Sequence, residues 1–592
     1  MTHSVHNHLF KRLKRYLPPH LAEYLRPNIA TDAALTIAIH ITSVRYVLST
    51  YLPRYLVDLI AQDPTPGKVS GGFRYGTVMF ADVSGFTAMS EKLSVLGKEG
   101  AEEITAIVNE YFDTMLDISA EYGGDLLKFG GDALLIFFEG EDGAHRAVVT
   151  AQKMQQAMTA FVQVKTSLGE FPLKMSIGMG TGPVFLANLG TVEGMEYAVM
   201  GRALSNMAKA EDRAAATQVM VDQNTKDAAA DIAEFSDAGD DFWLLENVAP
   251  FTPSENYLSQ EIEPPPLLAG GEALELLESC LPHITVIEGL RPFVPDDLLS
   301  RLIAGPQQPS LPGSHRPVTV MFANFYGIDE IIETLGQAHE DAITQILNTH
   351  FVTMSRILAR FGGVVNKVDT YAIGHRIMAL FGALHAHEDD PQRAVRAAVE
   401  MNRALGKVNE RAAKILSELP SDAEFGTEPL KQRIGLNSGF VFAGNVGSTA
   451  RREYSVMGDE VNLTARLMGI AKEGDVLISQ STARHVRNIF ELQAQEPVKV
   501  KGKSKPVANY VVSGERERPQ RWANLVSIPI VGRAPELKKG YNAVEQARNG
   551  QGNLLILSGV SGIGKTRLAE EIAYYGERAE LDLLAGTCLS YG

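Results

Sequence analysis

Hydrophobic and polar positions repeat in the same order in two long stretches of the chain, and in each stretch they predict alternating strands and helices. In the first stretch an apolar strand at 77–80 precedes a helix over 102–120, and a hairpin is centred near residue 132. A second helix over 144–161 and a strand over 174–179 follow. This alternation predicts an α/β (α+β) fold, in which helices pack on one face of a mixed sheet.

The second stretch is a diverged copy of the first. The run Thr77–Asp82 (TVMFAD) recurs as Thr319–Asn324 (TVMFAN), so one aspartate has become an asparagine. The same order of elements follows in the second copy, with an insertion near residues 405–428. Tandem copies that differ at positions suited to chemistry predict one composite site at their interface, to which each copy contributes different residues.

Proline-interrupted amphipathic helices are expected over residues 1–70. Pro53 in this region corresponds to Pro295 before the second copy, so we expect each copy to begin with a proline-capped helix that leads into its first strand. A chance proline before a helix is the alternative. Basic residues near the N-terminus could contact a membrane surface, but a solvated helix face is the simpler interpretation.

Changes in composition divide the chain into five parts. A proline-rich acidic stretch, 250–266, begins the link between the copies, and residues 515–519 follow the second copy. The predicted parts are a helical region at 1–70, a first copy at 71–248, a linker at 249–314, a second copy at 315–514 and the start of a further domain at 528–592.

The overall composition narrows the class of protein. The 592 residues, 45% of them hydrophobic, are enough for several packed domains, and the net charge of −16 argues against a general nucleic-acid binder. The two cysteines, Cys280 and Cys588, lie far apart, which argues against a disulfide framework and favours a reducing, cytoplasmic location. The sequence has neither an apolar run of the about 20 residues that a membrane span needs nor a signal-peptide pattern.

Two aspartates of the first copy are candidate metal ligands. Asp82 ends an apolar strand and precedes Val83 and a glycine turn, and Asp132 lies in a Gly-Gly-Asp turn. Carboxylates from neighbouring strand ends suit Mg²⁺, which prefers oxygen ligands and keeps waters and phosphate oxygens in its shell. Taken singly, each aspartate is more often a turn or cap residue.

Longer motifs around these residues resemble those of a known family. Two runs in the first copy are similar to the metal-binding motifs of the class III nucleotidyl cyclases: FADVSGFT at 80–87 and KFGGD at 128–132. Two runs in the second copy are similar to the purine-selecting and transition-state motifs of that family: NK at 366–367 and YSVMGDEVNLTAR at 454–466. The tandem order most resembles the soluble, bicarbonate-responsive type of adenylyl cyclase. The resemblance implies two cyclase domains that pair within the chain and convert ATP to cyclic AMP and pyrophosphate at one site.

The resemblance also assigns roles to individual residues. Asp82, Asp132 and the carbonyl of Val83 would hold two Mg²⁺ ions, for which Mn²⁺ could substitute. Lys367 would donate to N1 of adenine and Ser455 would accept from its amine, whereas guanine presents the reverse pattern. The remaining implied contacts are Phe86, Thr87 and Lys501 with the substrate, Asn462 with the ribose and Arg466 with the α-phosphate.

Asn462 and Arg466 are four residues apart, so they lie on one helix face, as the catalytic roles require. The alternative interpretation is that Asn462 is a cap or turn residue and that Arg466 forms an ion pair with a nearby carboxylate. The run around Lys501 could equally be a solvated hairpin.

The mirror-image site lacks the same chemistry. Asn324 stands at its metal position, and Ala198 is opposite Ser455, so we expect no turnover there. The site keeps Lys128, which with Val199 makes it a candidate regulatory site for an anion such as bicarbonate. Bicarbonate activation stays open, because Ala208 stands where the relatives have an arginine.

A P-loop pattern, GVSGIGKT at 559–566, follows an apolar run at 554–557 that we expect to be a strand and precedes a helix. The chain ends at Gly592, before an acidic strand that could position water, so the module looks truncated and unable to hydrolyse ATP. Its candidate nucleotide-binding residues are Gly559, Gly562, Gly564, Lys565 and Thr566.

Two rival hypotheses remain from the sequence. The copies could be degenerate domains that sense a nucleotide or an anion and regulate the P-loop module, or the substrate could be GTP. Asp82, Asp132 and Arg466 are all present, which argues against a pure sensor, and Lys367 argues against GTP.

Overall fold

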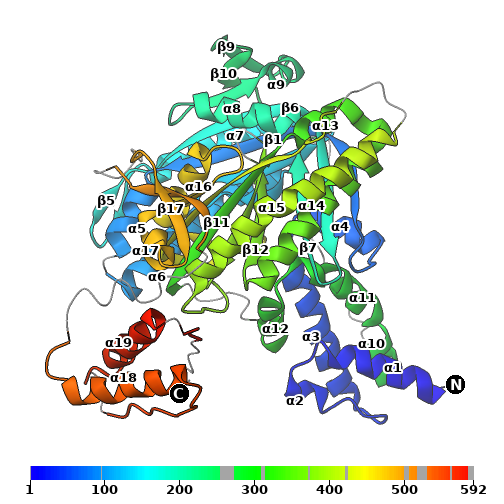
Figure 1. Cartoon of the computed structure of the whole chain (residues 1–592). Coiled ribbons are helices and arrows are strands. Elements are labelled where there is room, and N and C mark those ends of the chain that lie inside the picture. Colours follow the sequence, from blue (N-terminus) through cyan, green and yellow to red (C-terminus); the bar gives the residue numbers. More distant parts are fainter. Residues whose placement is uncertain are drawn as a thin grey trace. The chain divides into compact units, whose positions relative to one another are not determined.

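The computed structural model of the chain describes residues 2–94, 96–253, 272–307, 314–370, 374–419, 425–498, 506–516, 530–559, 563–579 and 581–584. They belong to two compact units, Met1–Thr482 with Ala494–Val511, and Ala483–Gln493 with Val512–Gly592. Nearly all of both copies lies in the first unit. Figure 1 labels helices and strands of the chain.

In the described part of the first copy, eight strands form a sheet in the order β2-β3-β1-β6-β8-β10-β9, with β7 paired to β6. Its pairs are antiparallel apart from β6 with β8. The strands are β1 (Ser70–Ser84), β2 (Asp125–Phe129), β3 (Leu134–Glu139), β6 (Lys174–Thr191), β7 (Gly194–Met200), β8 (Val219–Asp222), β9 (Ala233–Asp237) and β10 (Phe242–Val248), and β4 (Val164–Thr166) pairs separately with β5 (Gly169–Phe171).

Helices cover both faces of this sheet, whereas the sequence pattern predicted one face. Successive β1 residues point to opposite faces, so Met79 packs in the core with α6 and α7 while Val78 packs in the core with α8. A Cβ at Gly180 of β6 would lie 2.3 Å from the Ala203 carbonyl of α8, so glycine allows this close approach. The helices are α5 (Phe86–Ser94), α6 (Lys98–Glu121), α7 (Gly143–Ala157), η1 (Met158–Phe161), α8 (Arg202–Arg213) and α9 (Gln223–Ala228).

The second copy repeats this fold, and the predicted fold class is confirmed. Its sheet follows the same order, β12-β13-β11-β14-β16-β18, with β15 paired to β14. Thr319 pairs with Phe381 as Thr77 pairs with Phe138, so the register is also kept. The strands are β11 (Ser314–Tyr326), β12 (Val364–Thr370), β13 (His375–Phe381), β14 (Lys431–Gly447), β15 (Arg452–Met457), β16 (Val476–Ser479), β17 (Phe490–Ala494) and β18 (Asn509–Glu515).

Much of the expected insertion near 405–428 is helical, because α15 has 28 residues where its counterpart α7 has 15. The helices of the second copy are α13 (Ile328–Leu335), η4 (Gly336–His339), α14 (Glu340–Arg360), α15 (Asp390–Ser417), α16 (Asp459–Ile470) and α17 (Gln480–Val486).

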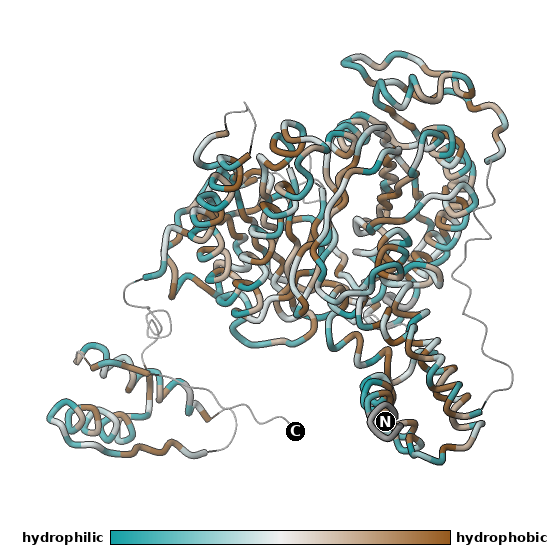
Figure 2. Tube along the Cα trace, turned by 90° about the vertical axis from the view of Figure 1, so that its right-hand side faces the viewer, coloured by the Kyte–Doolittle hydropathy of each residue, from teal (hydrophilic) through white to brown (hydrophobic). Residues whose placement is uncertain are grey.

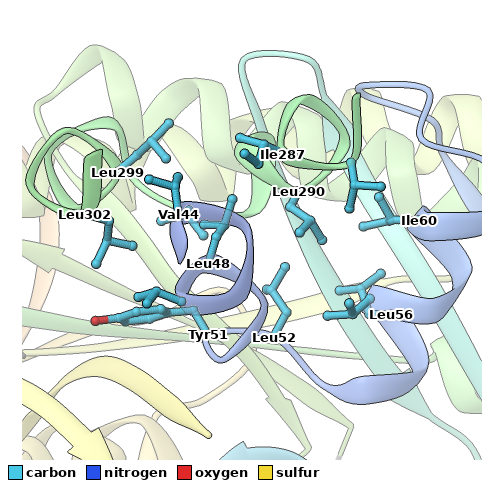
Figure 3. Packing of buried hydrophobic residues seen from close by; sticks show 14 of the residues in the cluster. Val44, Leu48, Tyr51, Leu52, Leu56, Ile60, Ile287, Leu290, Leu299 and Leu302 are labelled. Atoms are coloured by element: carbon cyan, nitrogen blue, oxygen red, sulfur yellow. The ribbon is translucent and has the colours of Figure 1, made fainter. Parts of the chain in front are cut away.

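A helical cluster forms from segments far apart in the sequence. It joins α1 (Thr2–Lys14), α2 (Pro19–Ala22), α3 (Thr31–Ser49) and α4 (Arg54–Gln62) with α10 (Ala273–Glu278), α11 (Leu281–Leu290), η3 (Arg291–Phe293) and α12 (Asp296–Ala304). Leu48, Leu56 and Leu290 are among the buried residues that meet there (Figure 3), and Figure 2 shows hydrophobic residues along these helices. Pro53 and Pro295 cap α4 and α12, as predicted.

Hydrogen bonds link the two copies within the first unit. The Phe73 amide donates to Glu340 Oε1 at 2.8 Å, and the Gly190 amide donates to Asn348 Oδ1 at 2.7 Å. Both acceptors lie on α14, which packs against β1 and β6 of the first copy. In addition, β12 of the second copy lies beside β7 of the first.

In the second unit, α18 (Ala534–Arg548) and α19 (Lys565–Arg578) are helical. The expected strand at 554–557 is wrong, since these residues pair with no strand in the described part of the chain and Leu554 is 84% exposed. A buried strand requires neighbours on both sides, and the sequence pattern alone does not supply them. Among the described residues, no helix has both the length and the apolar character to cross a membrane.

Candidate functional site

A cavity of about 340 Å³ lies between the two copies in the first unit. Its wall combines a turn and helix residues of the first copy with strands and a helix N-terminus of the second. Among the residues that line it are Phe86, Asp132, Phe322, Lys367, Asp369, Arg376, Met378, Val456, Asp459, Glu460 and Asn462.

Strand pairing brings Asp82 and Asp132 to the same end of the first sheet. Ala81 of β1 pairs with Leu134 of β3, so Asp82 follows this pair and Asp132 lies in the turn just before it. Gly85 then has φ of +101°, and a Cβ there would lie 2.3 Å from the Pro172 carbonyl oxygen. The strand runs two residues past Asp82, to Ser84, and the glycine then allows the chain to turn from β1 into α5.

The two carboxylates act on each other electrostatically. Burial and the neighbouring Asp82 raise the pKa of Asp132 to about 7. Burial, with both carboxylates, also raises the pKa of Tyr111 on α6. A divalent cation would relieve this repulsion, and carboxylate oxygens are the donors that Mg²⁺ prefers, so the residues fit a metal of this kind. No group of three or more histidine, cysteine, aspartate or glutamate side chains suited to a metal occurs in the described residues.

Lys367 of β12 is buried and reaches across to the first copy. Its Nζ donates to the Phe129 carbonyl oxygen, and to Glu453 Oε1 at 2.9 Å. Burial alone would lower the pKa of Lys367, but Glu453 and Asp369 hold it above the ordinary value. The lysine therefore remains charged, and the described contacts use two of its three N–H donors.

Ser455 does not join Lys367 at the cavity. The hydroxyl of Ser455 is buried and donates to Asn366 Oδ1 at 3.2 Å, and the residue is not among the described cavity-lining residues. Val456, the next residue of β15, lines the cavity instead. The assignment of Ser455 to the adenine stays a prediction.

Asn462 and Arg466 lie one turn apart on α16. Asn462 is exposed at the cavity wall, and Arg466 is half-buried. The helix begins after Gly458, whose φ of +136° suits glycine, and its N-terminal residues Asp459 and Glu460 line the same cavity. Phe86 is buried at the start of α5 in the opposite wall, Thr87 follows it in the helix, and Lys501 lies outside the described residues.

The mirror-image metal position is occupied by protein groups. Asn324 is fully buried, and its Nδ2 donates to the His375 carbonyl at 2.9 Å while Arg433 Nε donates to its Oδ1 at 2.8 Å. Arg433 pairs with Asn324 across β11 and β14, where Ser176 pairs with Asp82 in the first copy. Arg433 lies outside the sequence motifs, and only the register of β11 with β14 places it opposite Asn324.

The candidate anion site is also internally neutralised. Lys128 Nζ donates to Glu196 Oε1 at 2.8 Å and to the Tyr197 carbonyl at 3.0 Å. The Val199 carbonyl accepts a bond from Thr370 Oγ1 at 3.3 Å. Neither glutamate partner is one of the motif residues named above: Glu196 binds Lys128, and Glu453 binds Lys367.

In the second unit, the P-loop lysine binds its own loop. Lys565 Nζ donates to the Gly559 carbonyl oxygen at 2.9 Å, and Gly564 has φ of +95° just before α19. Gly562 lies outside the described residues, and Thr566 lies in the first turn of α19.

Comparison with protein families gives one match to the two copies. The family described as adenylate and guanylate cyclase catalytic domain matches residues 72–240 and 312–514, more than half of the chain.

Among curated proteins, the chain is 27% identical over 564 residues to adenylate cyclase type 10 of Oryctolagus cuniculus. This alignment covers 91% of this chain and 33% of that protein. It is 29% identical over 204 residues to an adenylate cyclase of Anabaena cylindrica, covering 34% of this chain and 37% of that protein. The chain therefore spans about a third of the length of these curated relatives.

Among solved structures, the chain is similar to the adenylyl cyclase CyaB from P. aeruginosa, with 28% identity and a TM-score of 0.30 over 35% of this chain and 98% of that chain. A class III adenylyl cyclase-like ATP-binding protein from Pseudomonas aeruginosa matches with 16% identity and a TM-score of 0.48, over 78% of this chain and 95% of that chain.

Proposed function

Because the chain belongs to the adenylate and guanylate cyclase catalytic domain family, we propose that its two copies pair within the chain and convert ATP to 3′,5′-cyclic AMP and pyrophosphate. The observation that carries this proposal is the composition of the cavity. Asp132, with Asp82 beside it, comes from the first copy, and Lys367 and Asn462 come from the second.

Asp82 and Asp132, with the Val83 carbonyl, would hold two divalent cations, and we propose Mg²⁺ with Mn²⁺ as a substitute. Such cations supply positive charge to the phosphate oxygens and to the 3′-oxygen of the substrate. The chain's own contribution is to fix two carboxylates at one sheet end. Their mutual repulsion favours occupancy by a cation over the empty state.

The second copy would bind and orient the rest of the nucleotide. Lys367, held by Glu453 and the Phe129 carbonyl, presents a donor to N1 of adenine. Asn462 would hold the ribose, and Arg466 would balance the charge that develops on the α-phosphate as the 3′-hydroxyl attacks it. Phe86, buried in the opposite wall, would exclude water from the reacting groups.

We propose one working site per chain. At the mirror-image position Arg433 supplies a guanidinium beside Asn324, which leaves no anionic pair for a cation to bind. Bicarbonate is not part of the proposal, because Glu196 and the Tyr197 carbonyl already bind the ammonium of Lys128.

The test is to incubate the purified chain with ATP and Mg²⁺ or Mn²⁺ and to measure cyclic AMP and pyrophosphate by chromatography. Asp82→Ala should abolish product, whereas Asn324→Ala should stay within a few-fold of wild type, because Asn324 lies at the mirror-image position and not at the proposed site. Equal loss of activity in both variants, or an inactive wild type that still binds ATP, would contradict the proposal.

A further inference from the structure

Asp369 and Arg376 form an ion pair in the cavity wall that the motifs did not assign. They face each other across β12 and β13, with Arg376 Nη2 3.8 Å from Asp369 Oδ2. The Arg376 side chain is only 20% exposed and that of Asp369 only 12%, and both line the cavity. A largely buried ion pair is by itself weak evidence for stability. Because both side chains line the cavity, they can contact a ligand there.

The pleat of β12 turns Asp369 to the same side as Lys367. Residues two apart on a strand share a face, and Lys367 and Asp369 are two apart. On β13 the partner residues Met378 and Arg376 are likewise two apart and line the same cavity. Phe322 of β11 also lines the cavity, with the Arg376 guanidinium 4.6 Å from its ring centre. The Lys367 ammonium, which is a donor, and the Asp369 carboxylate, which is an acceptor, therefore lie on the same side of β12, in a cavity that the apolar side chains of Phe322 and Met378 also line.

Adenine requires a donor and an acceptor in this arrangement. Its N1 accepts a hydrogen bond and its exocyclic amine donates one. Lys367 can supply the donor, whereas the hydroxyl of Ser455 is bonded to Asn366 and is not part of the described cavity wall. Asp369 presents carboxylate oxygens, which only accept hydrogen bonds when ionised.

We propose that Asp369 accepts the hydrogen bond from the exocyclic amine of adenine and that Arg376 is a positioning residue that holds this carboxylate toward the base. The inference rests on the proposed function, since that function places ATP in the cavity. It differs from the motif assignment, which gave this contact to Ser455.

The experiment compares ATP with purine riboside 5′-triphosphate, which lacks the 6-amine. For each variant the ratio of kcat/KM values for the two nucleotides is measured, with their affinities from competition against a fluorescent ATP analogue. In wild type, loss of the amine should cost about 10- to 100-fold, because the buried acceptor is left unpaired. In Asp369→Ala the ratio should fall to within about threefold of unity.

Each ratio is internal to one variant, so partial misfolding lowers both values and leaves the ratio unchanged. Asp369→Asn keeps an acceptor oxygen and should retain most of the preference, and Arg376→Met should lower it only in part. An unchanged ratio in Asp369→Ala, or its loss in Ser455→Ala instead, overturns the inference. A wild type that neither binds nor turns over ATP would instead defeat the proposed function.

Discussion

The Asp132 carboxylate lowers the stability of the metal-free fold, although the proposed site needs it as a metal ligand. Burial and Asp82 raise its pKa to about 7, from an ordinary value of 3.8. The folded protein therefore binds this proton more tightly than the unfolded chain does. Without metal, the free energy of unfolding should fall as the pH rises from about 4 to about 7.

Asp132→Asn removes this cost. In EDTA at pH 8, the variant should exceed wild type in unfolding free energy by about 1–3 kcal/mol, allowing for the partial exposure of the carboxylate, and the two should be similar at pH 4. Urea unfolding at both pH values measures the difference. Adding Mg²⁺ at pH 8 should stabilise wild type and not the variant; stabilisation of both would place the cation elsewhere.

Arg466 provides the second prediction for a single side chain. Its charge is needed when negative charge develops on the α-phosphate, so Arg466→Ala should lower kcat by about 100-fold or more and change KM much less. Steady-state kinetics with ATP measures both constants. Arg466→Lys keeps the charge and is the matched control. A rise in KM with unchanged kcat would assign Arg466 to ground-state binding.

Among the elements, α4 depends on a distant strand for its N-terminus. Pro53 caps this helix without a side-chain hydrogen bond. The Asp125 carboxylate at the start of β2 instead accepts from the Arg54 amide at 2.9 Å and the Tyr55 amide at 2.8 Å. The helical cluster is thereby connected to the strand that leads toward Asp132.

Asp125→Ala should lower the unfolding free energy by about 1–2 kcal/mol, the usual cost of losing an N-terminal cap. Asp125→Asn keeps one acceptor oxygen and should lose less. Thermal unfolding of the whole chain measures both variants. Equal destabilisation by alanine and asparagine would show that the carboxylate charge, rather than hydrogen bonding, matters at this helix end.

For the whole molecule, the proposed pairing of the copies within one chain makes a prediction about mixtures. Asp82→Ala disables the first copy and Arg466→Ala disables the second. If each chain pairs its own copies, the two variants should remain inactive after being unfolded and refolded together. Recovery of about a quarter of wild-type activity or more would show that copies pair between chains, as in a domain-swapped dimer.

Much of the candidate site could be proposed from the sequence, because its residues lie in short motifs. Asp82 and the glycine turn after it, Asp132 in its hairpin, and Asn462 four residues before Arg466 all depend on local geometry. The tandem fold was equally accessible, since the alternation of apolar and polar positions is repeated in both copies. The strand expected at 554–557 was wrong because a strand needs neighbours that its own pattern cannot specify.

Contacts between segments far apart in the chain could not be predicted in this way. Lys367 binds Phe129, 238 positions away, and Arg433 meets Asn324 only through the register of β11 and β14. The pairing of Ser455 with Asn366, and of Asp369 with Arg376, depends likewise on which side chains the strands turn toward the cavity. The local sequence thus determined the repeated fold and the motifs on which the proposed chemistry rests. Strand register and the packing of one copy on the other decided which groups share the cavity, because these are set by the sum of many distant contacts.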